Sequence, residues 1–221
     1  MSCNDEKKRP TGSSVDEPLR IGVLISGSGT NLQALIDLIG EGKLNAQIEM
    51  VIASNGKAAG LKRAADAGIQ TLALSPDLYK TDPMAADEVI AHEFLKRGVE
   101  YVIMAGYMRK VGPVLLRLFE NRVVNIHPAL LPSFQGAHGI SDAYERGVKV
   151  TGVTVHFANS VYDQGPIIAQ EVVRIEEGMT LDELEANIHA VEHVLYPQVV
   201  QMLADGRVHV NEDLTVSILP A

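Results

Sequence analysis

The sequence contains a single cysteine, Cys3, and lacks any apolar run approaching the roughly 20 residues that a membrane-spanning helix needs. One thiol cannot form an internal disulfide framework or a cysteine-based metal cluster. The first residues also lack the hydrophobic region of a secretion signal. We therefore expect a cytoplasmic protein with no membrane partner and no metal.

Basic residues are scarce relative to acidic ones, with 19 lysines and arginines against 28 aspartates and glutamates, a formal net charge of −9. Proteins that bind nucleic acid gain most of their affinity from Lys and Arg contacts to phosphates. This charge balance argues against a nucleic-acid partner and favours small-molecule substrates. A local phosphate pocket is still compatible with it.

Large apolar side chains are nearly missing from residues 1–18, which mix Lys, Asp, Glu, Ser, Gly and Pro. A segment of this composition buries too little apolar surface to order itself, so we predict a flexible N-terminal leader. The remaining residues, 19–221, suit one domain with a substantial core. We expect a monomer or a homodimer.

From Leu19 onward, short β-branched segments alternate with amphipathic helical segments, which is typical of βαβ units and a parallel sheet. The expected strands of this part are 20–26, 49–54, 70–74, 100–105 and 122–126. Two longer strands, 150–158 and 166–175, are joined through Asp163 without a helical segment and suit an antiparallel pair. The predicted fold class is α/β, an open, mostly parallel twisted sheet flanked by helices, with an antiparallel portion in the C-terminal half.

The C-terminal part is predicted to contain one long helix and a hairpin. Thr180 and Glu183 have the spacing of a capping box, so a helix is expected to begin at Thr180 and to end near Gly206. Residues 207–219 then suit a terminal hairpin.

Two glycines lie in the segment 26–31, between the first expected strand and the first expected helix. They allow a sharp turn, and the helix N-terminus offers free N–H groups and a partial positive charge of about +0.5. This combination predicts an anion site. The segment is neither a P-loop nor a complete Rossmann fingerprint, and a tight turn capped by Thr30 is the alternative interpretation.

Asn125 and His127 stand two residues apart at the end of an apolar run. In a strand, residues with this spacing point to the same face. An amide donor beside an imidazole suits a reaction with a developing oxyanion, and an acidic residue such as Asp163 would orient the ring. The alternative is a structural histidine in a His-Pro turn. Because the segments 27–31, 106–111 and 125–132 all follow expected strands, they should meet at one edge of the sheet.

Taken together, these segments resemble the phosphoribosylglycinamide formyltransferases, the folate-dependent glycinamide ribonucleotide transformylases of purine synthesis. The likeness runs from about Arg20 to Gly206 and is carried by residues 24–33, 104–109, 125–132, 152–157, 163–168 and 192–197. It implies a single formyltransferase-type domain. It also implies transfer of the formyl group of 10-formyltetrahydrofolate, a co-substrate, to the primary amine of glycinamide ribonucleotide.

The resemblance also assigns roles to individual residues. The catalytic residues that it implies are Asn125, His127 and Asp163. Those expected to bind glycinamide ribonucleotide are Gly29, Thr30, Asn31 and Glu192, and those expected to bind folate are Met108, Arg109, Lys110 and Val111. It further implies a cis bond before Pro132 and places His156 and Thr154 beside the site. Gln135 stands where relatives often have proline, which departs from the pattern.

Three rival functions fit parts of the pattern. A 10-formyltetrahydrofolate hydrolase shares the trio but is expected to carry an extra N-terminal domain. Methionyl-tRNA formyltransferase shares it too but needs a tRNA-binding domain and a more basic surface. A non-catalytic folate or nucleotide sensor is the third. Structural roles are expected for His189, His193 and His209, whereas His138 and His156 stay open between a structural and a site role.

Overall fold

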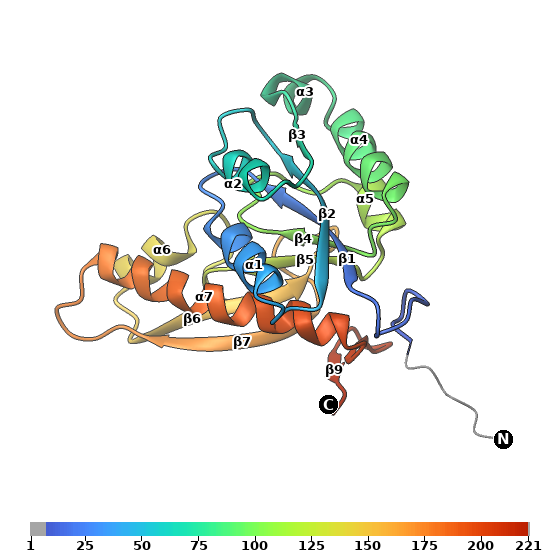
Figure 1. Ribbon diagram of the computed structural model, residues 1–221. Coiled ribbons are helices and arrows are strands. Elements are labelled where there is room, and N and C mark those ends of the chain that lie inside the picture. The colour runs from blue at the N-terminus through green and yellow to red at the C-terminus, as the bar shows by residue number, and fades with distance from the viewer. Residues whose placement is uncertain (1–7, 221) are drawn as a thin grey trace.

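Seven strands form one twisted sheet at the centre of the computed structural model, which describes residues 8–220 (Figure 1). The spatial order is β3-β2-β1-β4-β5-β6-β7. The strands are β1 (Leu19–Ile25), β2 (Ala46–Ala53), β3 (Thr71–Ala73), β4 (Tyr101–Met104), β5 (Val123–His127), β6 (Val150–Phe157) and β7 (Ile167–Arg174). The helices are α1 (Thr30–Gly40), α2 (Gly60–Asp66), α3 (Pro76–Thr81), α4 (Pro83–Lys96), α5 (Pro113–Leu118), α6 (Gly139–Arg146) and α7 (Leu181–Ala204).

The first five strands pair in parallel, whereas β6 pairs antiparallel with both β5 and β7. The predicted α/β class with an antiparallel C-terminal portion is therefore confirmed. The predicted terminal hairpin is also present, because β8 (Val208–Val210) pairs antiparallel with β9 (Val216–Ile218). The short helices α3 and α6 have no counterpart among the elements that the sequence predicts.

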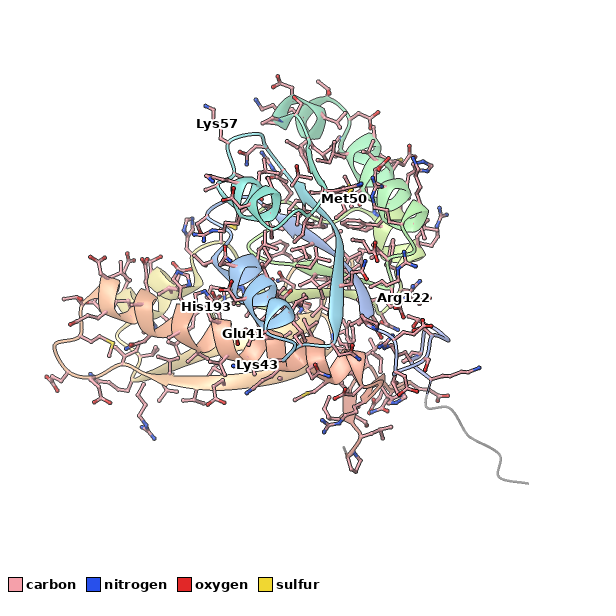
Figure 2. All side chains as sticks on the ribbon, in the orientation of Figure 1. Glu41, Lys43, Met50, Lys57, Arg122 and His193 are labelled. Carbon is pink, nitrogen blue, oxygen red and sulfur yellow. The ribbon has the colours of Figure 1, made fainter. Side chains whose placement is uncertain are left out.

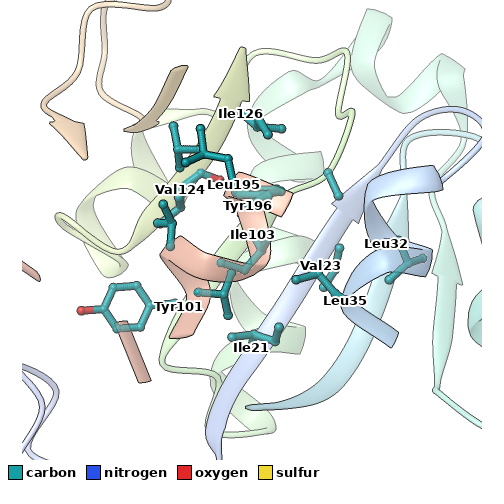
Figure 3. Packing of buried hydrophobic residues seen from close by; sticks show 14 of the residues in the cluster. Ile21, Val23, Leu32, Leu35, Tyr101, Ile103, Val124, Ile126, Leu195 and Tyr196 are labelled. Atoms are coloured by element: carbon teal, nitrogen blue, oxygen red, sulfur yellow. Dashed lines mark hydrogen bonds between the residues drawn. The ribbon is translucent and has the colours of Figure 1, made fainter. Parts of the chain in front are cut away.

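Helices cover both faces of the sheet, so the central strands are buried on both sides. Ile21 and Val23 of β1 pack with Leu32 and Leu35 of α1 in a core that also contains Tyr196 of α7 (Figure 3). The alternate residues of β1 face α4, which supplies the other core. This alternation is the period-2 pattern of a strand, and it fixes which loops emerge at the carboxyl edge.

The long helix α7 begins at the predicted capping box, in which Thr180 and Glu183 bond each other's backbone N–H groups. The hydroxyl of Tyr196 contacts the carbonyl oxygens of Met104 and Val124 at 3.0 and 2.9 Å. These bonds tie the middle of α7 to β4 and β5. As a result Glu192, one turn earlier, lies at the carboxyl edge of the sheet.

Residues 8–18 differ from the sequence expectation, because they pack on the domain. The Arg9 side chain is buried, and its Nε donates to the carbonyl oxygen of Ala204 at 2.7 Å. Its guanidinium lies 3.6 Å from Glu100, which also accepts a hydrogen bond from Thr11 at 2.6 Å. Flexibility is expected from the scarcity of apolar side chains in this segment, but polar contacts hold residues 8–18 in place instead. The rest of the predicted leader, residues 1–7, lies outside the described residues.

Candidate active site

Three loops meet at the carboxyl edge of β1, β4 and β5, as the sequence predicted. They line a cavity of about 340 Å³ that extends to α7. The sequence-predicted residues that it brings together are Gly29, Thr30, Asn31, Met108, Asn125, His127 and Glu192. The proposed anion loop and two members of the proposed trio therefore share one space.

Asn125 is oriented by a histidine on the neighbouring strand. It pairs in register with His156 of β6, and its Nδ2 donates to His156 Nε2 at 3.1 Å. His156 Nδ1 in turn donates to the carbonyl oxygen of Phe157 at 2.9 Å. Burial lowers the pKa of His156 and so favours the neutral ring. A neutral ring with its proton on Nδ1 presents Nε2 as an acceptor, which fixes the amide of Asn125.

His127 is almost fully buried and has an oxygen beside each ring nitrogen. Nε2 donates to the carbonyl oxygen of Phe134 at 2.8 Å, and Nδ1 lies 3.6 Å from Asp163 Oδ2. Phe134 follows the Leu131–Pro132 bond, which is cis as the resemblance implied, and has a φ of 53°. Nε2 thus has a hydrogen-bond acceptor, whereas 3.6 Å is longer than a hydrogen bond, so an N–H at Nδ1 could point to another acceptor in the site.

Asp163 is held in a tight turn between β6 and β7. Its φ is 53°, its side chain is buried, and its Oδ2 accepts from the N–H of Gly136 at 2.8 Å. Its Oδ1 lies 3.8 Å from Nε2 of His156. The carboxylate is therefore fixed between two histidines, and it faces the ring that the sequence assigned to it.

A second, narrow hollow of about 20 Å³ is lined in part by two members of the trio, Asn125 and Asp163. Among the residues that line it are Arg109, Lys110, Val111, His156 and Asp163. Asn125 and Tyr162 border both hollows. Of the four residues predicted to bind folate, three thus lie in this narrow hollow, whereas Met108 lies in the larger cavity.

The sequence model of the formyl transferase family matches residues 19–200. The chain belongs to this family. In the described range 8–220, no cluster of His, Cys, Asp and Glu side chains has the arrangement of a metal site. Over the same residues, the helices are all too short or too polar to cross a bilayer.

Several formyl transferase family members are similar over most of this chain. The human trifunctional purine biosynthetic protein adenosine-3 is 40% identical over 196 residues, which are 88% of this chain but 19% of that protein. The phosphoribosylglycinamide formyltransferase of Bacillus subtilis is 35% identical over 83% of this chain and 94% of its own length. The crystal structure of glycinamide ribonucleotide transformylase 1 from Symbiobacterium toebii superposes with a TM-score of 0.87 and 44% identity, covering 92% and 95% of the two chains.

Two side chains on α7, Glu192 and His189, also line the larger cavity. Glu192 is buried, and its Oε2 accepts hydrogen bonds from Asn31 Nδ2 at 3.0 Å and from His189 Nδ1 at 2.9 Å. The bond to Glu192 raises the pKa of His189. His189 also stacks on His193, which Figure 2 labels on α7. His189 lines the larger cavity, and its bond to Glu192 favours the charged form of the ring.

The sequence predicts a structural role for His189 and does not predict that its side chain lines the cavity. The signal was available, since His189 and Glu192 are three residues apart on a helix and such residues share a face. Sequence reasoning also gave no role to Ser26. Its hydroxyl contacts Ser54 at 2.7 Å and accepts from the N–H of Met108 at 2.8 Å, so it ties the glycine loop to the loop after β4.

Proposed function

We propose that this protein transfers the formyl group of 10-formyltetrahydrofolate to the primary amine of glycinamide ribonucleotide in de novo purine biosynthesis. The observation that carries the proposal is that Asn125 lines both hollows, while His127 lines the larger one and Asp163 the narrow one. The larger hollow is lined by the glycine loop, which suits an anion, and the narrow one is lined by two cationic side chains, Arg109 and Lys110. The trio therefore adjoins both places proposed for a substrate.

In this arrangement the larger cavity takes the ribonucleotide. The N–H groups of Gly29, Thr30 and Asn31 at the start of α1 bind its phosphate, since a helix N-terminus favours anions. Glu192, fixed by Asn31 and His189, accepts hydrogen bonds from its polar groups. The position of these residues in the lining of the larger cavity supports these roles.

The folate co-substrate occupies the side of the site formed by the loop after β4. Val111 offers an apolar contact, while Arg109 and Lys110 offer positive charge for its carboxylates. Arg109 is held 5.1 Å above the ring of Tyr79, which restricts its direction. Met108 lies toward the larger cavity, next to the reacting groups.

The chemistry is a direct attack of the substrate amine on the formyl carbon, which forms a new C–N bond and places negative charge on the formyl oxygen. The Asn125 amide and protonated His127 stabilise that oxygen by hydrogen bonding. Asp163 orients His127 and guides a water that moves a proton from the attacking amine to the folate nitrogen. The bond between the formyl carbon and that nitrogen then breaks, and no covalent enzyme intermediate is needed.

Turnover that depends on the ribonucleotide is the first expected result. We would follow the absorbance change of 10-formyl-5,8-dideazafolate, a stable folate analogue, with and without glycinamide ribonucleotide. Conversion only in its presence is expected, because the amine is the nucleophile. Conversion in its absence would contradict the proposal and favour a hydrolase, while no conversion in either mixture would favour a folate or nucleotide sensor.

We further expect His189 to make ribonucleotide binding depend on pH. The bond to Glu192 raises the pKa of His189, so the charged ring persists to higher pH than for an ordinary histidine, and its positive charge attracts the phosphate. The gain in ribonucleotide affinity from the charged His189 ring is present at low pH and is lost as pH rises through the raised pKa. In His189→Gln, KM for the ribonucleotide should exceed the wild-type value by about two- to fivefold at low pH, as for other half-exposed charges.

The pH dependence of His189 is measured as the ratio of variant to wild-type KM between pH 6 and pH 9. Taking the ratio cancels the ionisation of the phosphate itself. The ratio should approach 1 at high pH, and a ratio that does not change with pH would contradict this role. A cytoplasmic location and a monomeric or homodimeric state stay predictions from the sequence.

A further inference from the structure

The carbonyl oxygens of the glycine loop between β1 and α1 accept hydrogen bonds from three residues distant in the sequence and from one residue of α1. Each carbonyl oxygen of residues 26–29 accepts a hydrogen bond. In order, the donors are Asn55 Nδ2 at 3.0 Å, Gly60 N at 3.1 Å, Arg63 Nε at 2.9 Å and Gln33 N at 2.9 Å. All four carbonyls of the loop therefore have a fixed direction.

The direction of a carbonyl determines the direction of the next N–H. Because the peptide unit is planar and trans, the N–H of one residue points opposite to the carbonyl of the residue before it. The bond from Arg63 to the Ser28 carbonyl thus sets the direction of the Gly29 N–H. Residues 26–31 line the larger cavity, whereas none of the four donor residues does.

The start of α2 is packed tightly against the same loop, as the positions of α1 and α2 in Figure 1 illustrate. Gly29 has a φ of 71°, and a Cβ added to it would lie 2.6 Å from the Cα of Gly60. A Cβ added to Gly60 would lie 2.7 Å from Ile25. This close approach is open only to glycine at both positions, and it brings Arg63, one turn later in α2, to the loop.

We propose that Arg63 is a positioning residue for the substrate phosphate, because its guanidinium aims the Gly29 N–H into the cavity. The inference rests on the proposed function, which places the phosphate at this loop. Arg63 is the one charged side chain among the four donors. Its second bond, from a terminal nitrogen to Gln33 Oε1 at 3.2 Å, joins the loop to the first turn of α1. Because the guanidinium is planar and rigid, its bonds to the Ser28 carbonyl and to Gln33 Oε1 fix the positions of these two acceptors relative to each other.

The test compares Arg63→Met, Arg63→Lys and the control Lys62→Met. Lys62 is the neighbouring cation on α2, is exposed, and pairs with Asp66 at 2.6 Å. Arg63→Met should raise KM for glycinamide ribonucleotide by about tenfold, as expected on losing a hydrogen bond from a charged group. KM for the formylfolate analogue and kcat at saturation should not change. Arg63→Lys should have an intermediate KM for glycinamide ribonucleotide, since an ammonium group can hold one of the two acceptors. Lys62→Met should have the wild-type KM.

Binding of inorganic phosphate, measured by calorimetry, provides a readout that does not depend on turnover. Its dissociation constant should rise in Arg63→Met by the same factor as KM. An unchanged dissociation constant for phosphate in Arg63→Met would overturn the positioning role. Equal increases of this constant in Lys62→Met and Arg63→Met would overturn it too, because they would show that only the positive charge of the side chain matters. A parallel loss of kcat, of folate affinity and of thermal stability would indicate a purely structural role.

These outcomes separate the inference from the proposed function. A wild-type protein without ribonucleotide-dependent turnover would refute the function, and phosphate binding would still decide the role of Arg63. A wild-type protein that turns over, together with an unaffected Arg63→Met, would refute the positioning role alone.

Discussion

Asn125→Ala is expected to lower kcat by about 10²–10³-fold, the usual cost of removing one hydrogen-bond donor to a developing oxyanion. The amide of Asn125 is held by His156, so the wild-type donor does not need to reorient during the reaction. KM for the ribonucleotide should change little, because the phosphate is bound by the glycine loop at the start of α1. Steady-state kinetics with each substrate varied in turn would measure both effects.

Two comparisons make the Asn125 result specific. Asn187→Ala, which truncates an exposed asparagine on α7, should retain wild-type kinetics. Thermal unfolding of Asn125→Ala should show that the fold is kept. Should Asn125→Ala keep full kcat, the oxyanion role would be wrong, and a raised KM with unchanged kcat would instead indicate uniform binding of substrate and transition state.

Gly165→Ala is expected to lower the free energy of unfolding by about 3 kcal/mol, the upper end of typical overpacking costs. A Cβ at Gly165 would lie 1.7 Å from the carbonyl oxygen of Phe157 and 2.8 Å from its carbon. Both are backbone atoms of β6, so no side-chain rotation relieves the overlap. The turn must shift, and with it Asp163, so kcat should fall as well. Urea unfolding would measure the stability loss.

Gly40→Ala is the matched control for the Gly165 substitution. Gly40 is the last residue of α1, and a Cβ there would meet nothing within 4 Å. Alanine in a helix is favoured over glycine by up to about 1 kcal/mol, so this variant should be as stable as the wild type or more so. Equal unfolding midpoints for the two variants would contradict the described packing of the turn.

The elements that the sequence predicted well are those with a local signal. The alternation of apolar strands with amphipathic helices gave the α/β class, and the spacing of Thr180 and Glu183 gave the start of α7. The i, i+2 spacing put Asn125 and His127 on one face of β5. The order of the loops put them at the edge where the cavity lies. The structure brings these residues together, and their chemical roles stay predictions.

The elements that the sequence did not predict depend on contacts between distant segments. Polar contacts to Glu100 and Ala204 order residues 8–18, although their composition predicts disorder. His189 lines the cavity because α7 approaches α1, where Asn31 donates a hydrogen bond to Glu192. No periodicity marks such contacts, because hydrogen bonds between distant residues leave no pattern in either segment.

The sequence by itself determined the fold class, the residues at the carboxyl edge of the sheet and the formyl transferase family resemblance. These depend on side-chain periodicity and on motif residues that lie close together along the chain. Only the tertiary structure decided that His156 orients Asn125, that His127 lies between Phe134 and Asp163, and that α2 supports the glycine loop. Each of these is a hydrogen bond or close contact whose geometry exists only once strands and loops from different parts of the chain are packed together.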